Sequence, residues 1–451
     1  MSNERSGFSS RLGFVLATAG SAVGLGNIWR FPYLAAKYGG GTFLLTYLIL
    51  TLTFGFSLMI TEVALGRKAG TSAIRAFGHF SKKHTFIGYL TTIIPFIIFP
   101  YYCVIGGWVT KYALVSLQGG IHNAASDTFF TGFISKSAEP MICVLVFLIA
   151  TTVVVAGGVK GGVERVSTIM MPVLIVLLIG VALFCITRPG AMAGVAYYLK
   201  PSLKGFGPTT ILAALGQLFY SMSLAMGIMI TFGSYMPKKA DLEKSVTQVE
   251  IFDTGVAFLA GLMIVPAVFV FSNGDSSMLA KGPSLMFVML PKVFDSMAFS
   301  SVIAAVFFIL VLLAALTSSI SLLETLVAVL MDKFHMKRGT ACITMFIIAL
   351  LLAVPSSLGF GAWSNITIFG FDFLDFFDFI SNSVLMPIAA FLTCIFVGYI
   401  IKPKEIIDEV ESSGEFKRKP LFLVMVKYIA PICIVAILVF SVLEGLGFIT
   451  V

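Results

Sequence analysis

The sequence predicts an all-α protein that crosses a lipid bilayer many times, and three observations support this fold class. Of the 451 residues, 58% are hydrophobic and only 12% are charged, whereas soluble domains carry about 25% charged residues. A chain of this size cannot bury so much apolar surface in one core, and the same abundance of apolar residues excludes disorder. The apolar runs also lack the alternation of barrel strands, so helices are the expected spanning structure.

Eleven segments are long and apolar enough to span a bilayer, which takes about 20 residues. Most Lys and Arg lie in loops on one side of these spans, the side that the positive-inside rule assigns to the cytoplasm. We therefore expect one multi-pass domain over residues 1–451 in the cell (plasma or inner) membrane, with a cytoplasmic N-terminus and an extracytoplasmic C-terminus. The expected spans are 11–37, 41–66, 87–117, 139–157, 165–186, 208–236, 242–273, 293–331, 337–355, 366–401 and 421–447.

Several other classes of function find little support in the sequence. The net charge of +8 is spread through short loops and forms no stripe for nucleic acid. The six cysteines show no disulfide or zinc spacing, and the four histidines lie in polar connecting segments. The spans contain no nucleophile–base pair, metal motif or P-loop, so we expect neither an enzyme nor a primary pump. No obligate protein partner is indicated, and the lipid bilayer is the expected environment.

Two of the spans are interrupted by small and polar residues at their centres. The first span reads GSAVGLGNIWR at mid-depth, and the sixth reads SMSLAMG at a similar depth. Close packing of helices through small residues is one explanation, but it does not account for Asn27 and Arg30 in the first span. Unwound backbone at membrane depth is tolerated only where it lines a cavity. The sequence therefore predicts two broken helices around a central site.

The positions of the two interrupted spans suggest two repeats of five helices. The first repeat covers about residues 8–186 and the second about 206–401, followed by an extra helix at about 421–447. Interrupted helices at matching positions of two halves indicate a transporter's central site. Free amides at a helix end suit a carboxylate, and unwound carbonyl oxygens suit sodium. An amino acid and a sodium ion would together fit such a break.

The first broken span also carries a family signature. The stretch GSAVGLGNIWRFPY from Gly20 to Tyr33, with the following KYGGGTF, closely resembles the first-helix motif of the neurotransmitter:sodium symporter family. The resemblance runs from about Arg5 to about Gly447. It implies an inverted five-plus-five helix repeat with discontinuous helices 1 and 6, and sodium-driven uptake of amino acids or amines. Sodium ions would be transported ligands and not catalytic cofactors.

The resemblance also assigns ligands, residue by residue. One sodium site would use Ala22, Asn27, Ser221, Asp253 and the substrate carboxylate, and a second would use Gly20, Val23, Ala314, Thr317 and Ser318. For Thr317 and Ser318, hydroxyl bonds to their own helix are the alternative. The substrate would contact Ser21, Ala22, Gly24, Leu25, Gly26, Ile98, Tyr102, Tyr220, Ser221, Ser223, Met226 and Leu322.

Asp253 departs from the family pattern, which usually has Asn at this position. Nearby, Ala257 replaces a Ser found in chloride-dependent members and an acid found in some chloride-independent ones. A negative charge close to bound sodium neutralises it, whether it comes from chloride or from a carboxylate. We therefore predict that Asp253 supplies this charge and that chloride is not required. A carboxylate at a helix start in the inner loop is the simpler alternative.

The pocket residues predict the class of substrate. Gly24 stands where relatives that carry monoamines have an Asp, which favours an amino acid over an amine. No charged residue appears among the expected contacts, and an unpaired buried charge would be costly. Met226 is flexible and packs well against rings. The substrate is therefore expected to be a neutral amino acid with a large hydrophobic or aromatic side chain.

Further residues resemble the family's gates. On the outer side Arg30 would pair with Asp375, although Asp372 and Asp378 lie three residues away on either side, and Tyr102 and Tyr220 would form a lid. On the inner side Arg5 would pair with Asp332 near Ser234 and Tyr235, unless both charges are simply solvated. Glu62 would brace the unwound segment. Gly162 and Pro172 bracket a turn that could open at the start of the fifth span, or mark an ordinary helix start.

Two alternatives to sodium symport stay open. The same fold could use protons, because Asp253 and Glu62 could titrate. A non-transporting membrane sensor is the second alternative.

Overall fold

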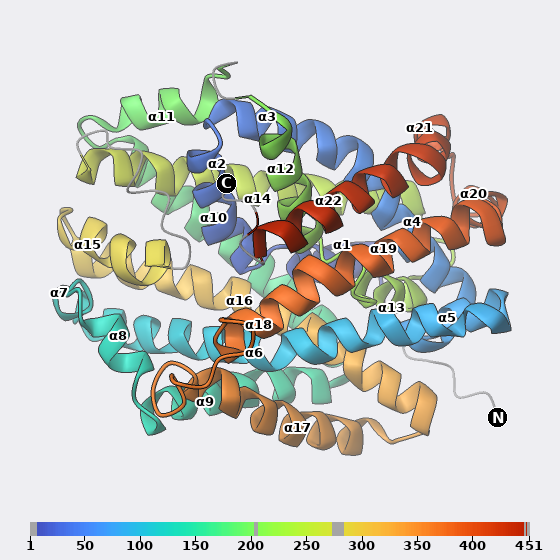
Figure 1. Ribbon diagram of the computed structural model, residues 1–451, viewed down its shortest axis with the longest axis horizontal. Coiled ribbons are helices and arrows are strands. Elements are labelled where there is room, and N and C mark those ends of the chain that lie inside the picture. Colours follow the sequence, from blue (N-terminus) through green and yellow to red (C-terminus); the bar gives the residue numbers. More distant parts are fainter. Residues whose placement is uncertain (1–6, 203–205, 273–283, 446–447, 449–451) are drawn as a thin grey trace.

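The computed structural model describes residues 7–202, 206–272, 284–445 and 448. These residues form helices joined by short loops, and within them the β pairing amounts to the isolated bridge between Ile368 and Phe371. The long helices run roughly along the longest axis of the molecule and pack into one bundle (Figure 1). The predicted all-α membrane fold is therefore confirmed.

The predicted spans correspond to observed helices with small shifts at their ends. Nine helices in the described part of the chain are long and apolar enough to cross a membrane, and a pair bent by 55° makes a tenth. The spanning helices that follow the bent pair are Gly41–Ala69 (α3, the π-helical turn η2, α4), Thr85–Leu117 (α6), Ala138–Ala156 (α9), Val159–Ile186 (η4, α10), Leu242–Phe271 (α14), Ser300–Phe334 (α16), Arg338–Leu358 (α17), Phe373–Ile400 (α18, η7, α19, η8) and Lys419–Gly445 (α21, η9, α22).

The bent pair is the predicted broken helix 1. Helix α1 (Arg11–Ala22) ends at the glycine-rich stretch, and the chain continues as the π-helical turn η1 (Gly26–Arg30) and α2 (Phe31–Lys37). Span six is broken as well, because α12 (Pro208–Ser221) and α13 (Ile228–Tyr235) are separated by the non-helical residues 222–227. The polar and small residues of the two breaks therefore interrupt the helices where the sequence predicted.

In the described part of the chain, six shorter α-helices lie outside the spans. They are α5 (Ala73–Phe80), α7 (Ile121–Ala124), α8 (Phe129–Ile134), α11 (Ala191–Leu199), α15 (Leu290–Asp295) and α20 (Lys404–Glu411). Helix α15 corrects one predicted boundary: the span expected to begin at 293 begins at Ser300, because residues 296–299 form a turn that ends with Phe299 in the left-handed region.

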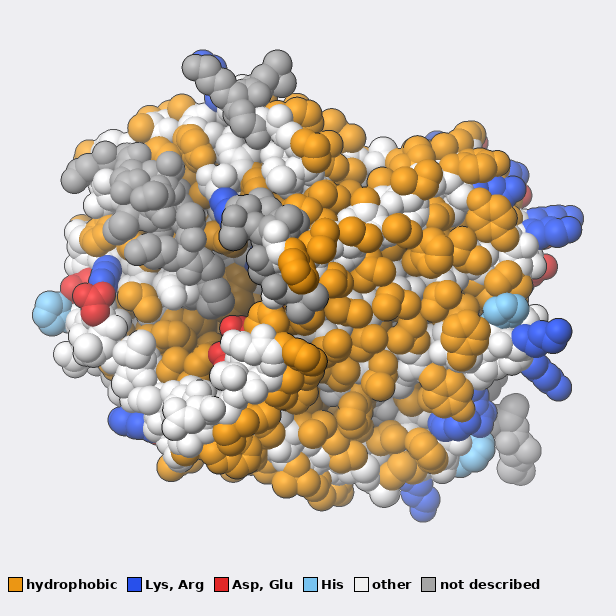
Figure 2. Space-filling view, in the orientation of Figure 1, with side chains coloured by type: hydrophobic (Ala, Val, Ile, Leu, Met, Phe, Trp, Pro, Cys, Tyr) orange, Lys and Arg blue, Asp and Glu red, His pale blue; other side chains and the backbone are white. Residues whose placement is uncertain are grey.

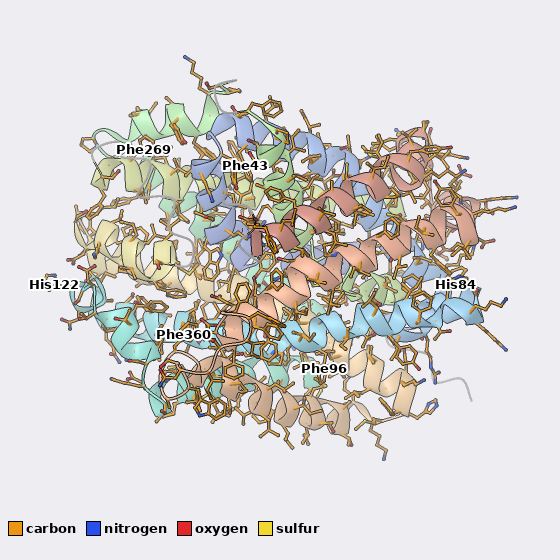
Figure 3. All side chains as sticks on the ribbon, in the orientation of Figure 1. Phe43, His84, Phe96, His122, Phe269 and Phe360 are labelled. Carbon is orange, nitrogen blue, oxygen red and sulfur yellow. The ribbon has the colours of Figure 1, made fainter. Side chains whose placement is uncertain are left out.

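The surface is divided as a bilayer requires. A broad band of hydrophobic side chains covers the middle of the face in Figure 2, and Lys and Arg gather mainly at the end that carries α5, α20 and α21. We call this the α20 end and the opposite one the α8 end. His84 and His122 mark these two ends in Figure 3, so the polar connecting segments lie away from the apolar band.

Candidate functional site

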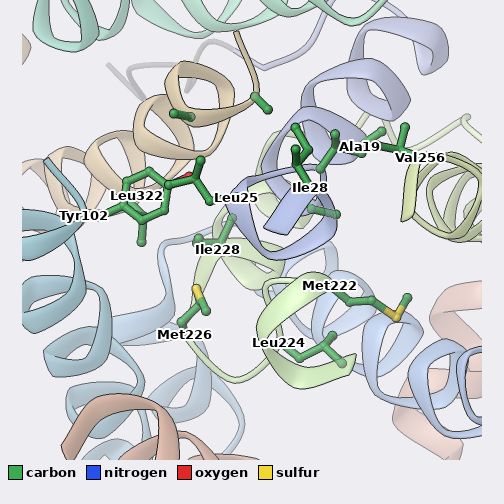
Figure 4. Packing of buried hydrophobic residues seen from close by; sticks show 14 of the residues in the cluster. Ala19, Leu25, Ile28, Tyr102, Met222, Leu224, Met226, Ile228, Val256 and Leu322 are labelled. Atoms are coloured by element: carbon green, nitrogen blue, oxygen red, sulfur yellow. The ribbon is translucent and has the colours of Figure 1, made fainter. Parts of the chain in front are cut away.

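The two breaks enclose a cavity at the centre of the bundle. It offers about 40 Å³ to water-sized solutes, enough for about three waters. Its walls come from the two breaks and from helices α6 and α16. Figure 4 shows five of the lining side chains close together: Tyr102, Leu322, Leu25, Ile228 and Met226. Among the described residues that line it, none is charged. They are Ser21, Ala22, Gly24, Leu25, Gly26, Ile98, Tyr102, Tyr220, Ser223, Met226, Ile228, Ser318 and Leu322.

Most of the predicted substrate contacts meet at this cavity. The exception is Ser221, whose hydroxyl turns to Asp253 instead. Two further residues line the cavity: Ser318, which was predicted for the second sodium site, and Ile228, which the sequence analysis missed. Ile228 begins α13 just after the break, and a buried Ile at a helix start carries no sequence signal that separates it from ordinary packing.

Gly24 and the Tyr102 hydroxyl lie close together at one corner of the cavity. A Cβ atom on Gly24 would lie 2.5 Å from the Ser318 hydroxyl and 3.4 Å from the Tyr102 hydroxyl, so only glycine leaves this corner open. The Tyr102 hydroxyl is buried and makes no hydrogen bond of ordinary geometry within the described structure. Buried hydroxyls normally have a hydrogen-bond partner. A ligand in the cavity could supply the partner for this one.

Asp253 on α14 organises a polar cluster beside the break of helix 1. The Asn27 amide donates to its carboxylate at 2.7 Å and the Ser221 hydroxyl at 2.9 Å. The Tyr47 hydroxyl also donates to it at 3.3 Å. All of these side chains are buried. Three of the four residues predicted for the first sodium site are thus in direct contact, while Ala22 lies on the cavity wall.

A second cluster joins helix 1 to α16. The Thr317 hydroxyl donates to the Ala314 carbonyl at 3.0 Å and approaches the Val23 carbonyl at 3.5 Å. The Ser318 hydroxyl lies 3.4 Å from the same Val23 oxygen. Gly20 packs on Thr317, where a Cβ would come within 3.3 Å of the threonine Cβ. The residues predicted for the second sodium site therefore adjoin one another, with the Val23 carbonyl between both hydroxyls.

The break in span six is held by Glu62. Its carboxylate accepts a hydrogen bond from the Ala225 amide at 2.7 Å, which is the bracing contact that the resemblance implied. Ala225 and Ser223 both adopt positive φ, 62° and 52°, a conformation that is unfavourable for residues other than glycine. The unwound segment therefore needs a partner such as Glu62 to hold it.

The residues predicted for the outer gate lie near one another. No ion pair between Arg30 and Asp375 occurs in the described structure; the Arg30 guanidinium lies 5.2 Å from the centre of the Tyr220 ring. Asp375 sits in the first turn of α18, where its own amide is capped by Asp372. Asp378 instead shares a small cavity with Arg30 and Tyr220, and the Tyr101 hydroxyl donates to its carboxylate at 3.1 Å.

Tyr220 belongs to both cavities. It lines the central cavity on one side and the cavity of Arg30 and Asp378 on the other. Its ring therefore separates the centre from the space beyond, as a lid would. Tyr102, the other predicted lid residue, lines only the central cavity of these two.

The predicted inner gate is described only in part. Arg5 lies outside the described residues. The Asp332 carboxylate accepts from the Ser72 amide at 2.7 Å and from the Thr71 hydroxyl at 3.0 Å. The Tyr235 hydroxyl donates to Glu324 at 2.8 Å.

The buried Glu324 carboxylate also forms an ion pair with the partly buried Arg338, at 2.6 Å. The sequence analysis missed this pair, because neither residue stands in a motif and only the packing of α16 on α17 joins them. Ser234, also expected here, donates to the Thr231 carbonyl of its own helix.

The predicted opening in the fifth span is closed in this structure. The π-helical turn η4 (Val159–Glu164) leads directly into α10 (Arg165–Ile186), which continues past Pro172. Gly162 packs tightly on the preceding helix, since a Cβ there would lie 1.9 Å from the Val154 carbonyl oxygen. Gly162 thus allows η4 to pack closely against the end of α9, and any larger residue at this position would force the two apart.

Comparisons with known proteins agree with this architecture. The profile of the Sodium:neurotransmitter symporter family matches residues 5–131 and 129–446. An uncharacterised sodium-dependent transporter of Bacillus subtilis, YhdH, is 35% identical over 95% of this chain and 96% of its own length. The human sodium- and chloride-dependent GABA transporter 2 is 25% identical over 98% of this chain and 80% of its own length.

A solved structure is also similar over nearly the whole chain. The crystal structure of MhsT in complex with L-phenylalanine matches with a TM-score of 0.88 and 38% identity, covering 97% of this chain and 100% of that one. The family profile, the sodium-dependent relatives and the two broken helices around a shared cavity lead to one conclusion. This chain belongs to the sodium:neurotransmitter symporter family: it is a sodium-dependent membrane symporter and not an enzyme.

Proposed function

We propose that this symporter imports a neutral amino acid with a large hydrophobic or aromatic side chain, together with sodium, by alternating access. The observation that carries the proposal is the buried Tyr102 hydroxyl beside Gly24, which makes no hydrogen bond of ordinary geometry in the described structure. A substrate carboxylate at this corner would accept a hydrogen bond from Tyr102. The absence of a side chain on Gly24 leaves room for that carboxylate and introduces no competing charge.

The walls of the cavity support a neutral and apolar side chain. Ile98, Met226 and Leu322 line it, and no charged group is among its described lining residues. The present volume of about 40 Å³ is small, so a large side chain would displace its neighbours. Met226 can yield because methionine is unbranched and flexible. That MhsT was solved with L-phenylalanine supports an aromatic substrate in this related cavity.

The two polar clusters are the proposed sodium sites. In the first, Asp253, Asn27 and Ser221 with the Ala22 carbonyl would surround one ion beside the substrate carboxylate. Asp253 would provide the negative charge and make chloride unnecessary. In the second, the carbonyls of Gly20, Val23 and Ala314 would join the hydroxyls of Thr317 and Ser318. Both sets are hard oxygen ligands, which sodium requires.

We further propose how the molecule sits in the membrane. The basic α20 end would face the cytoplasm, as the positive-inside rule requires, with the N-terminus there and the C-terminus outside. Arg30, Asp378 and Tyr220 would then close the outer path, and Tyr235 and Asp332 the inner one. Two repeats, about 8–186 and 206–401, would move around the site, with the helix at 421–447 outside both.

Uptake in proteoliposomes tests the proposal. Labelled phenylalanine, tyrosine, tryptophan and leucine should accumulate under an inward sodium gradient and not when potassium or choline replaces sodium at fixed pH. Labelled lysine and glutamate should not accumulate. Accumulation driven by a proton gradient without sodium would favour the proton-coupled alternative, and binding without accumulation would favour a sensor.

A further inference from the structure

The side chain of Glu164 makes a set of contacts that the sodium and substrate sites do not use. It lies in η4, at the start of the fifth span, and is only 6% exposed. Its carboxylate accepts from the Ser9 amide at 2.8 Å and from the Ser9 hydroxyl at 2.6 Å. The Ser10 hydroxyl approaches the same carboxylate at 3.4 Å. Glu164 thus joins the fifth span to the residues that precede α1.

The first turn of α1 is shaped to receive this carboxylate. Ser10 caps the helix by accepting from the Gly13 amide. A Cβ atom on Gly13 would lie 1.8 Å from the Glu164 Oε1 atom, and its three nearest atoms all belong to the Glu164 side chain. A carboxylate at a helix N-terminus is also favoured by the helix dipole. Gly13 therefore leaves the slot that Glu164 fills.

The same short segment is held on its other side by α13. The Phe8 amide donates to the Tyr235 carbonyl at 3.0 Å, and the Phe8 ring packs edge-on against Phe232 and Tyr235. The start of helix 1 is therefore fixed at two points, one on α13 and one on the turn before α10.

Glu164 also lies at one end of a face that leads to the proposed second sodium site. Glu164 and Thr168 line an open cavity of about 430 Å³ with Ser9 and Ser10. Met171, one turn farther along the same face of α10, is fully buried, and its sulfur would lie 3.4 Å from a Cβ on Gly20. Gly20 in turn packs on Thr317. Separation of α1 from α10 would therefore connect the cavity with this cluster.

We propose that Glu164 is a positioning residue that holds the start of helix 1 against the fifth span and so keeps the path from the second sodium site closed. Its carboxylate acts through Ser9 and Ser10, and Gly13 makes the contact possible. The inference rests on the sodium symport of the family and on the proposed second sodium site, not on the identity of the amino acid.

Hydrogen–deuterium exchange of the purified full chain tests this proposal without any amino acid present. Glu164→Ala removes the carboxylate, and Gly13→Ala displaces it while leaving Glu164 in the sequence. In low sodium, each variant should lower the protection of amides in 7–22 and in 159–172 by about tenfold, since charge-assisted hydrogen bonds hold the closed form. Saturating sodium, but not potassium, should restore that protection, because sodium favours the closed form by mass action.

Two comparisons make the test specific. The control Glu411→Ala removes an exposed carboxylate at the same end of the molecule, paired only with Lys419 among the ion pairs described, and should leave both segments protected. In the Glu164→Ala background, Gly13→Ala should cause no further loss, because the slot is already empty.

Four results would overturn the proposal: unchanged protection in Glu164→Ala, loss spread equally over α14 and α16, no rescue by sodium, or an additional tenfold loss in the double variant. A failure of amino-acid uptake in proteoliposomes would instead concern the proposed substrate and leave these exchange results unaffected.

Discussion

At the scale of single residues, the sequence predicted which residue types line the site better than it predicted which charged side chains lie next to each other. Asn27 and Arg30 beside the glycines of the first break indicated a cavity because packing alone did not explain them, and the family resemblance added Tyr102. For Arg30 the sequence indicated Asp375 and left Asp372 and Asp378 open, and the described structure places Asp378 in one cavity with Arg30. Three carboxylates follow one another at intervals of three residues, so the tertiary fold decides which of them lies near Arg30. No local pattern records that choice.

The Tyr102 hydroxyl provides the first prediction. Tyr102→Phe should weaken amino-acid binding by roughly tenfold to a hundredfold, the loss expected for a hydrogen bond to a charged group. Thermal stability should hardly change, because the hydroxyl makes no hydrogen bond of ordinary geometry in the described protein. Equilibrium binding of labelled phenylalanine in saturating sodium measures the effect.

Tyr112 on the same helix is the matched control. Its hydroxyl donates to the Phe287 carbonyl at 2.6 Å, away from the cavity. Tyr112→Phe should therefore cost about 1 kcal/mol of stability and leave binding intact. Equal losses of binding in the two variants would contradict the role given to Tyr102.

Asp253 provides the second prediction, which concerns the anion. Wild-type uptake should be the same in sodium chloride and in sodium gluconate if, as proposed, the Asp253 carboxylate supplies the negative charge next to the ion. Asp253→Asn removes that charge and should lower sodium-stimulated uptake by about tenfold or more, as expected for a unit charge in contact with an ion. Asp241→Asn, which removes the charge of an acid remote from the site but keeps an oxygen that can cap α14, should leave the sodium dependence unchanged. A collapse of wild-type uptake in gluconate would contradict this account.

At the scale of helices, the sequence predicted both breaks, but local composition explains only the break in span one. Span one is rich in glycine, and glycine weakens a helix, so the sequence itself indicates the break. Span six turns at Ser223 and Ala225, residues that rarely adopt positive φ, so a tertiary contact must hold it. The Glu62 carboxylate supplies that contact from a distant helix, and the family resemblance rather than local propensity indicated it.

The Glu62 brace provides the third prediction. Glu62→Ala leaves the Ala225 amide without its acceptor in a buried segment, which should lower the free energy of unfolding by about 2 kcal/mol. Glu139→Ala, which removes a more exposed acid with two lysine partners, should change stability by less than about 0.5 kcal/mol. Denaturant titration in detergent measures both. If the two variants proved equally stable, the brace would have no energetic role.

At the scale of the whole molecule, the hydropathy pattern predicts the spans. It does not predict the polar contacts that join the ends of different spans. Arg67 at the end of α4 is fully buried and donates to the Glu409 carboxylate at 2.7 Å and to the Ala240 carbonyl at 2.8 Å. It therefore joins three segments that are remote in sequence. Such contacts were missed because a charged residue at the end of a span looks like any loop residue.

This anchor provides the fourth prediction. Arg67→Ala should cost about 3–5 kcal/mol, because Glu409 is left buried with the more exposed Lys238 as its remaining ion-pair partner among the described residues. Arg67→Lys should not restore the loss, since an ammonium cannot reproduce the planar set of donors. Limited proteolysis should then cut the segment around α20 (404–411) sooner than in wild type. An unchanged cleavage rate would contradict the role of Arg67 as an anchor.

The central claim is that sodium and an amino acid bind together at the two helix breaks, and the most direct measurement is their mutual effect on affinity. Binding of labelled sodium to the purified protein would be titrated with and without phenylalanine, and binding of labelled phenylalanine with and without sodium. Two ligands that share a site must change each other's affinity by the same factor, and we predict an increase of at least about tenfold in both directions. Phenylalanine binding that is unaffected by sodium would contradict the account.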